Sequence, residues 1–334
     1  NIILDVNRIR NYNLGYEKKK SLNVGVQGAL LDYALTFDVN AFVTRYDGQV
    51  IKRNSYYPAY LSSFFAYENY NADRYMGFDA AISYTKKWGD FSLTAGLNML
   101  YARSKVVVRD EVYNNAYQYR KGKPVDAIFG LQNLGFFNND AEIASAAEQK
   151  FGTVRPGDIH YIDQNSDKVV DEEDEVMIGK SNPDFTGALH LTFKYKDFSL
   201  FIMGEGATGH DIIYNNNYYW VDGNKKYSAE VWNRWTPETA ATATYPRLSS
   251  TQNDNNNRTS DFWMRKADYF SLSRVQLNYN FPNTLLRRTF IRDLSLYLRG
   301  SNLLMAAQDV KKRQLNIGSE PQFRYYALGL KVSF

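Results

Sequence analysis

Hydrophobic and polar residues alternate along several stretches of the chain. From Leu22 to Leu30 and from Leu35 to Val43, apolar side chains take every second position, and polar residues or glycine lie between most of them. A period of two is typical of β-strands whose two faces meet different surroundings. A short corner at Asp32 and Tyr33 joins the two stretches, which are therefore predicted to form a hairpin.

The same alternation returns seven more times, so the sequence predicts nine strands. The further stretches are 76–84, 91–99, 189–195, 198–202, 275–281, 294–298 and 326–334. The connections between the nine strands alternate between short ones near 32, 88, 196 and 282–291, and long polar ones over 47–73, 105–186, 207–262 and 304–322. Short turns at one end and long loops at the other are typical of a transmembrane β-barrel, in which the long loops are extracellular.

A soluble β-sandwich also alternates, and it is the commoner explanation of such a pattern. The polar positions here carry mainly Asn, Gln, Ser, Thr, Gly and Asp, which suit a wet lumen, whereas a sandwich surface tends toward Lys and Glu. The apolar positions carry almost no charge over roughly ten residues, enough for a tilted strand to cross the hydrocarbon layer. The pattern therefore favours an all-β, antiparallel transmembrane barrel segment. A soluble or surface-attached carbohydrate-binding or adhesin domain stays open as the alternative.

Composition narrows the function further. The 334 residues include no cysteine, which excludes disulfides, thiolate metal sites and a cysteine nucleophile. The net charge of +4, from 40 basic and 36 acidic residues, is too balanced for a protein that binds nucleic acid by neutralising phosphates. No apolar run reaches the ~18 residues of a membrane-spanning helix. Aromatic residues make up 16% of the chain, which favours strands and interfacial positions.

No catalytic motif stands out, so the sequence predicts that the protein is not an enzyme. A nucleophile elbow, an HExxH metal motif, a phosphate-binding loop and a dinucleotide fingerprint are all missing. The three histidines, His160, His190 and His210, are scattered singly and are predicted to be structural.

The sharpest local signal is an acidic stretch from Asp163 to Asp174. Its oxygen ligands have the spacing of a twelve-residue calcium loop, although Lys168 replaces the usual glycine and Asp174 the usual glutamate. The predicted ligands are Asp163, Asn165, Asp167, the Val169 carbonyl, Asp171 and Asp174. A calcium ion is the only cofactor that the sequence suggests. The alternative is a solvated acidic turn held by side-chain to backbone hydrogen bonds.

Aromatic and basic residues also gather inside the long loop over 207–262. Candidate contacts to a ligand or a partner are Trp220, Trp232, Arg234 and Trp235. Trp and Tyr provide a large contact area at a low entropy cost, so such loops can stack on sugar rings or anchor a protein interface. The alternative is packing within the loop.

Several motifs in order resemble those of one family. They are RPGDIHYID from Arg155 with the acidic stretch, Ile178-Gly179, Asn182-Pro183-Asp184-Phe185, GLQNLGFF from Gly130, Arg234-Trp235-Thr-Pro237-Glu238, Tyr245-Pro246-Arg247, the segment 263–282, the terminal YALGLKVSF, and Gly15-Tyr16-Glu17 with Leu22-Asn23-Val24-Gly25. Together they resemble SusC/RagA-type TonB-dependent outer-membrane transporters over almost the whole chain. A final strand that ends in an aromatic residue, here Phe334, also fits an outer-membrane protein.

The resemblance implies a fold, a place and partners. Such transporters are 22-stranded barrels with an N-terminal plug and a TonB box, so residues 1–334 are expected to be the C-terminal portion, about nine strands, without the plug. It implies import of glycan or peptide ligands across the outer membrane of a Gram-negative bacterium, driven by the TonB complex through the absent N-terminal part. A SusD-like surface lipoprotein is the implied partner, and the loops 105–186 and 207–262 are the implied contact surface. Both edge strands would need further strands, because lipid cannot satisfy an open sheet edge.

Overall fold

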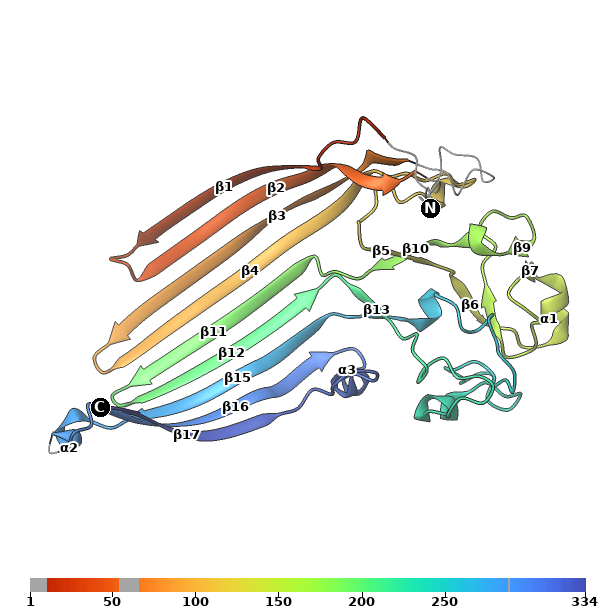
Figure 1. Cartoon of the computed structure of the whole chain (residues 1–334). Coiled ribbons are helices and arrows are strands. Elements are labelled where there is room, and N and C mark those ends of the chain that lie inside the picture. The colour runs from red at the N-terminus through yellow and green to blue at the C-terminus, as the bar shows by residue number, and fades with distance from the viewer. Residues whose placement is uncertain (1–10, 54–65, 288) are drawn as a thin grey trace, which may run out of the picture.

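The chain forms one long antiparallel sheet with an irregular body at one end (Figure 1). The computed structural model describes residues 11–53, 66–287 and 289–334. Nine strands pair in the order β1-β2-β3-β4-β11-β12-β15-β16-β17. Their bounds are β1 Lys18–Leu30, β2 Leu35–Lys52, β3 Tyr67–Trp88, β4 Phe91–Val108, β11 Phe185–Tyr195, β12 Phe198–Thr208, β15 Tyr269–Asn280, β16 Asp293–Ala307 and β17 Tyr325–Ser333. The predicted nine-stranded antiparallel architecture is confirmed.

The remaining elements are short and lie mostly in the connections. Four two-stranded pairs are β5 (Ala127–Gly130) with β10 (Val176–Lys180), β6 (Asn133–Phe136) with β8 (Ile159–Tyr161), β7 (Glu148–Gln149) with β9 (Val169–Val170), and β13 (Asp211–Ile213) with β14 (Met264–Lys266). The helices are α1 Asp140–Ser145, α2 Asn283–Leu286 and α3 Val310–Leu315, and the 3-10 turns are η2 Ala116–Gln118, η3 Glu172–Asp174, η4 Ala229–Asn233 and η5 Asp261–Trp263. No described helix has the length and apolar character to span a membrane.

The register of the sheet places the apolar positions of all nine strands on one face. Residues that are direct partners across an antiparallel pair point to the same side. One continuous row of partners runs through Leu30, Leu35, Tyr84, Ala95, Leu191, Ile202, Val275, Gly300 and Tyr326. We call this side of the sheet the apolar face. A one-residue slip in any strand would interrupt it, so the hydrophobic pattern fixes the register.

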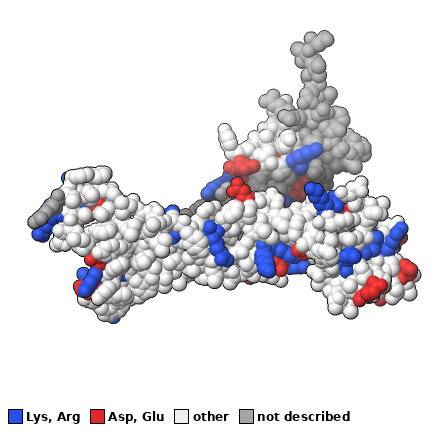
Figure 2. All heavy atoms as spheres, turned by 90° about the horizontal axis from the view of Figure 1, so that it is seen from below, with Lys and Arg blue, Asp and Glu red and all other residues white. Residues whose placement is uncertain are grey.

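The apolar face stays exposed to the surroundings of the chain. Leu22 is 66% exposed, Phe78 41% and Leu328 73%, and no second sheet of described residues covers them. Seen from below, much of the surface between the two ends of the molecule carries neither acidic nor basic side chains (Figure 2). A self-contained sandwich would bury these residues, so this arrangement does not favour the soluble alternative.

An aromatic row marks the end of the apolar face that carries the short turns. Five consecutive register partners are aromatic, and they are Trp88, Phe91, Tyr195, Phe198 and Tyr279. Neighbouring rings contact one another, with 5.6 Å between the centroids of Trp88 and Phe91 and 4.8 Å between those of Phe198 and Tyr279. Aromatic girdles at a membrane–water interface have this composition and position.

Several strands extend beyond the alternating stretches that predict them. β4 continues to Val108 and β15 begins at Tyr269, so the long connections cover 109–184 and 209–268. Bulges interrupt the alternation at these ends, between Ala72 and Asp73 opposite β4 and between Leu272 and Arg274 in β15, and a period-two pattern breaks at a bulge. The predicted connection 47–73 shrinks to 53–66, most of which lies outside the described residues.

Candidate ligand-binding and partner-binding surface

The two long connections fold together into one body, which we call the cap (residues 109–184 and 209–268). It lies at the end of the sheet opposite the short turns (Figure 1). The cap has its own hydrophobic core, built from both connections. The core residues are Leu131, Phe151, Ile159, Tyr161 and Val170 from the first connection, and Tyr214, Tyr219, Val221, Val231, Tyr245 and Trp263 from the second. Shared burial of this kind holds the connections in a single arrangement.

A buried carboxylate joins the two connections at the centre of the cap. Asp158 is 0% exposed. The Arg247 guanidinium donates from Nη2 to Asp158 Oδ2 at 2.9 Å, and its Nε lies 2.8 Å from Oδ1. The Asn253 and Asn256 amides donate to Oδ1 at 3.0 and 2.8 Å, and the Arg155 backbone N–H donates to Oδ2. Such complete pairing is what a buried charge requires.

An asparagine-rich run supplies further polar contacts inside the cap. The Asn256 side-chain oxygen accepts from the Ile159 N–H at 2.8 Å, and the Asn256 carbonyl accepts from the Trp263 indole at 2.8 Å. The Asn255 amide donates to the Ile159 carbonyl, and the Tyr161 hydroxyl donates to the Asn255 carbonyl at 2.8 Å. Sequence reasoning did not single out this run, which has the composition of an ordinary polar loop, and its role becomes visible only from contacts distant in sequence.

Trp235 belongs to the packing of the cap. It is 7% exposed, and its backbone N–H donates to the Tyr245 carbonyl at 2.8 Å. Its ring lies over Gly157, where an added Cβ would come within 2.4 Å of the indole. Gly157 also has a φ of +89°, a backbone conformation that favours glycine. The glycine of the RPGD motif therefore makes room for this tryptophan.

The other candidate contact residues occupy different environments. Trp232 is 81% exposed and offers its ring to a ligand or partner. Trp220 is half-buried, with its ring centroid 6.5 Å from that of Trp263. Arg234 is half-buried, and its Nη1 donates to the Val231 carbonyl at 3.4 Å. Of the four aromatic and basic candidates, Trp232 is thus the one whose side chain stands freely at the surface.

The acidic stretch forms a tight turn held by its own carboxylates. The Asp163 oxygens accept from the backbone N–H groups of Ser166 and Lys168 at 2.7 and 2.8 Å, and Asp167 Oδ1 accepts from Val169 at 2.8 Å. Lys168 has a φ of +70°, the conformation for which calcium loops use glycine at this position.

The last acidic side chain of this stretch is buried. Asp174 is 0% exposed, and its oxygens accept from the Gln164 and Asp171 N–H groups at 2.7 and 2.9 Å. Burial raises the pKa of Asp174, partly offset by these hydrogen bonds. The donors are of the kind that calcium uses, but no group of three or more acidic or histidine side chains converges on one point within the described residues. These contacts are those of an acidic turn, and calcium binding stays a prediction.

Burial also shifts the ionisation of other cap residues. The Tyr245 hydroxyl donates to the Tyr219 carbonyl at 2.7 Å, and burial raises the pKa of Tyr245 to about 12. The His160 ring stacks on Phe137 with 4.1 Å between centroids, and burial lowers the pKa of His160, partly offset by the Glu142 carboxylate. The contacts of both side chains lie inside the cap and contribute to its packing.

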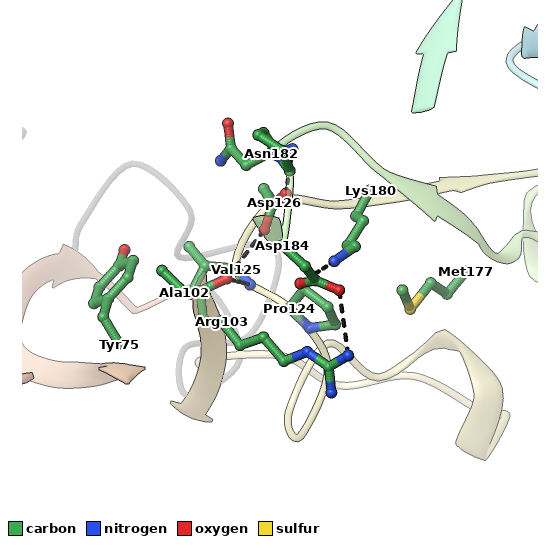
Figure 3. A pocket seen from close by; sticks show the side chains of 12 residues that line it. Tyr75, Ala102, Arg103, Pro124, Val125, Asp126, Met177, Lys180, Asn182 and Asp184 are labelled. Atoms are coloured by element: carbon green, nitrogen blue, oxygen red, sulfur yellow. Dashed lines mark hydrogen bonds and ion pairs between the residues drawn. The ribbon is translucent and has the colours of Figure 1, made fainter. Parts of the chain in front are cut away.

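A cavity of 450 Å³ lies where the cap meets the ends of β3 and β4 (Figure 3). Its lining includes Tyr75 and Ser104, which are partners on the face opposite the apolar one. Asp126 accepts from the Ser104 hydroxyl at 3.0 Å and from the Asn182 N–H at 2.7 Å. Asp184 pairs with Lys180 and, at 3.3 Å, with Arg103. The Asn182-Pro183-Asp184 motif thus shapes a recess at the rim of the sheet, with both apolar and charged side chains in its lining.

Comparisons with known proteins agree on one class. No family model matches the chain. Among curated proteins, TonB-dependent receptor P26 of Formosa agariphila is 23% identical over 99% of this chain, and receptor P3 of the same organism is 22% identical over 97%. The chain spans 36% and 35% of the lengths of these receptors, about a third.

Solved structures show the same fold. In the structure of the RagAB peptide importer in the open-open state, one chain superposes with a TM-score of 0.73 at 20% identity, covering 97% of this chain and 35% of that one. The closed-closed state gives a TM-score of 0.70 at the same identity. The resemblance to SusC/RagA-type TonB-dependent transporters is confirmed, and the nine strands correspond to part of such a barrel. These relatives are named as receptors and importers, which agrees with the prediction that the protein is not an enzyme.

Proposed function

We propose that the chain is the C-terminal part of a TonB-dependent importer in the outer membrane of a Gram-negative bacterium. The observation that carries the proposal is the exposed apolar row across nine strands, which meets lipid if the opposite face lines a wet lumen. The TonB complex would act through a plug and TonB box on the N-terminal part of the protein. The outer strands β1 and β17 would pair with the remaining barrel strands.

The substrate that we propose is an oligopeptide or an oligosaccharide. It would bind to polar groups of the lumen and the cap, with the recess between Ser104 and Asp184 and the exposed ring of Trp232 as contact points. Similarity to a peptide importer supports peptides as the first ligands to test. We propose that the cap is extracellular and that a SusD-like surface lipoprotein closes over it. No covalent chemistry is needed.

Membrane insertion is tested by two neighbouring substitutions in the intact transporter. Val275→Arg puts a charge on the apolar face, whereas Gln276→Arg puts the same charge on the opposite face. A cationic side chain near the bilayer centre costs about 2–4 kcal/mol, so V275R is expected to lower the amount of heat-modifiable barrel in outer membranes and Q276R is not. Equal amounts for both variants, or a freely soluble wild-type protein, would defeat the proposal.

Transport is tested by uptake of labelled oligopeptides and oligosaccharides into cells with and without a working TonB complex. Uptake of one class that requires both the transporter and TonB is the expected result. Uptake that continues without TonB would contradict an energised importer. Co-purification of a surface lipoprotein with the wild-type transporter, and its weaker retention by Trp232→Ala, would support the proposed lid contact.

A further inference from the structure

A band of cations crosses the apolar face at its cap end. Lys20, Arg45, Arg74 and Lys105 are consecutive register partners on β1 to β4. The next row toward the short turns is Leu22, Val43, Met76 and Arg103. That adjoining row is apolar except for Arg103, which pairs with Asp184, so the charged row begins at the edge of the apolar surface on the same face of the sheet. Basic side chains in that position reach the headgroup layer while their stems contact acyl chains.

Two of the four cations of this band have an acidic partner among the described residues and two do not. Lys20 and Arg45 both pair with Asp47, at 3.2 and 2.5 Å. Arg74 and Lys105 make no ion pair with any described acidic residue, and the buried Arg74 Nε has no hydrogen-bond partner in the described part of the chain. A buried guanidinium N–H without an acceptor is costly unless a ligand supplies one.

A cavity of 590 Å³ opens beside these two cations. A third cation, Lys121, lines the cavity together with Arg74 and Lys105. None of the described residues that line it is acidic. Val107, Ala116 and Tyr119 give it an apolar wall. The segment after β4 folds back to make this wall, since the Gly122 N–H donates to the Val106 carbonyl at 2.8 Å. At the edge of a lipid-facing surface, three cations beside apolar groups can bind an amphipathic anion: the cations contact its charged group and the apolar groups its hydrocarbon part.

We propose that Arg74, Lys105 and Lys121 bind the phosphate group of a phosphorylated glycolipid of the outer leaflet, whose acyl chains lie along the apolar face below. The inference rests on the proposed function, because it needs the apolar face in lipid and the cap outside. Arg74 supplies the Nε–H that lacks an acceptor, and the two lysines supply further donors. The headgroup would thus contact both the barrel strands β3 and β4 and the first residues of the cap.

The test uses the intact transporter, extracted from outer membranes in mild detergent and analysed by native mass spectrometry. The variant is R74Q/K105Q/K121Q, and the matched control is K87Q/K226Q/K311Q, which removes three exposed cations elsewhere. Wild type and control are expected to retain a phosphorylated glycolipid, and the site variant about tenfold less, since each charge-assisted contact is lost. The charge-conserving variant K105R/K121R, which keeps Arg74 and its Nε–H, should retain the lipid.

Add-back experiments identify the source of the anion. Delipidated wild-type protein receives lipid A with its phosphate, dephosphorylated lipid A, or inorganic phosphate at equal concentration, and the shift in Tm is measured. Only phosphorylated lipid A should raise Tm, and the site variant should not respond. Equal lipid retention by site variant and wild type, or an equal Tm shift with inorganic phosphate, would overturn the inference. If wild type is a heat-modifiable outer-membrane protein that retains no such lipid, the inference fails while the proposed function stands; absence from the outer membrane defeats both.

Discussion

Arg247 reaches across the cap to Asp158, 89 residues away in the sequence, and neutralises a carboxylate that has no exposed surface. The pair connects the Tyr-Pro-Arg motif of the second connection to the Arg-Pro-Gly-Asp motif of the first. Both motifs therefore serve the internal structure of the cap, which in turn fixes where its surface residues lie.

Removal of this guanidinium is expected to loosen the cap. Arg247→Met leaves Asp158 buried without its ion pair, at a cost of about 3–5 kcal/mol. Arg247→Lys keeps the charge but not the paired geometry and should cost less. The measurement is the rate of proteolytic cleavage within the cap of the detergent-solubilised protein.

Arg234→Met is the matched control, because among the described residues the Arg234 side chain makes one long hydrogen bond, to the Val231 carbonyl. It should leave the cleavage rate close to that of the wild type. Equal cleavage of R247M and R234M would show that the buried pair does not hold the connections together.

Gly157→Ala is expected to displace Trp235. Both this substitution and Gly152→Ala place a side chain at a positive φ, +89° and +121°, which costs about 1–3 kcal/mol. Only at Gly157 would the new Cβ also meet the indole, and such overpacking adds about 1–3 kcal/mol. Tryptophan fluorescence and cap proteolysis should change more for G157A than for G152A. If G157A and G152A changed fluorescence and proteolysis equally, backbone strain alone would explain the effect of G157A.

Acidification is expected to weaken the cap through His160. Because burial lowers the pKa of His160 in the folded protein, the folded state binds this proton less tightly than the unfolded chain. The free energy of unfolding of the cap should therefore fall as the pH drops below the ordinary value of 6.5. His160→Phe keeps an aromatic ring against Phe137 and should flatten the pH dependence of cap proteolysis between neutral and mildly acidic pH. An unchanged profile in this variant would assign the effect to other groups.

Calcium is predicted to raise the Tm of the intact protein through the acidic stretch, and Asp163→Ala with Asp167→Ala should abolish that rise. A second outcome distinguishes the acidic turn. If the carboxylates only accept the N–H groups of Ser166, Lys168 and Val169, the double variant lowers Tm by the same amount with calcium or with a chelator. Thermal unfolding in both buffers separates the two cases.

The strands could be predicted from sequence because their signal is local. In each stretch, such as Leu35 to Val43, apolar and polar residues alternate with a period of two, and the strand that pairs with it shows the same alternation. The row from Leu30 to Tyr326 then follows from pairing every strand in phase. The bulges next to Asp73 and Arg274 could not be predicted, because a bulge shifts the alternation of apolar and polar positions by one residue near the end of a strand.

The cap could not be predicted in the same way, because its order comes from contacts between residues far apart in the chain. Nothing near Trp235 distinguishes it from Trp232, yet the first packs on Gly157 and the second is 81% exposed. The run Asn253 to Asn257 has a loop composition, and its hydrogen bonds to Asp158 and Ile159 depend on a fold-back of about a hundred residues. The acidic turn was accessible from sequence, since its hydrogen bonds are local.

The shared interior of the two connections has a consequence for protein engineering. Grafting one connection from a related protein would separate Asp158 from Arg247 and the aromatic rings of one half from those of the other. Chimeras should therefore tolerate an exchange of both connections as a unit better than an exchange of either alone, because the ion pair and the shared aromatic core then stay together.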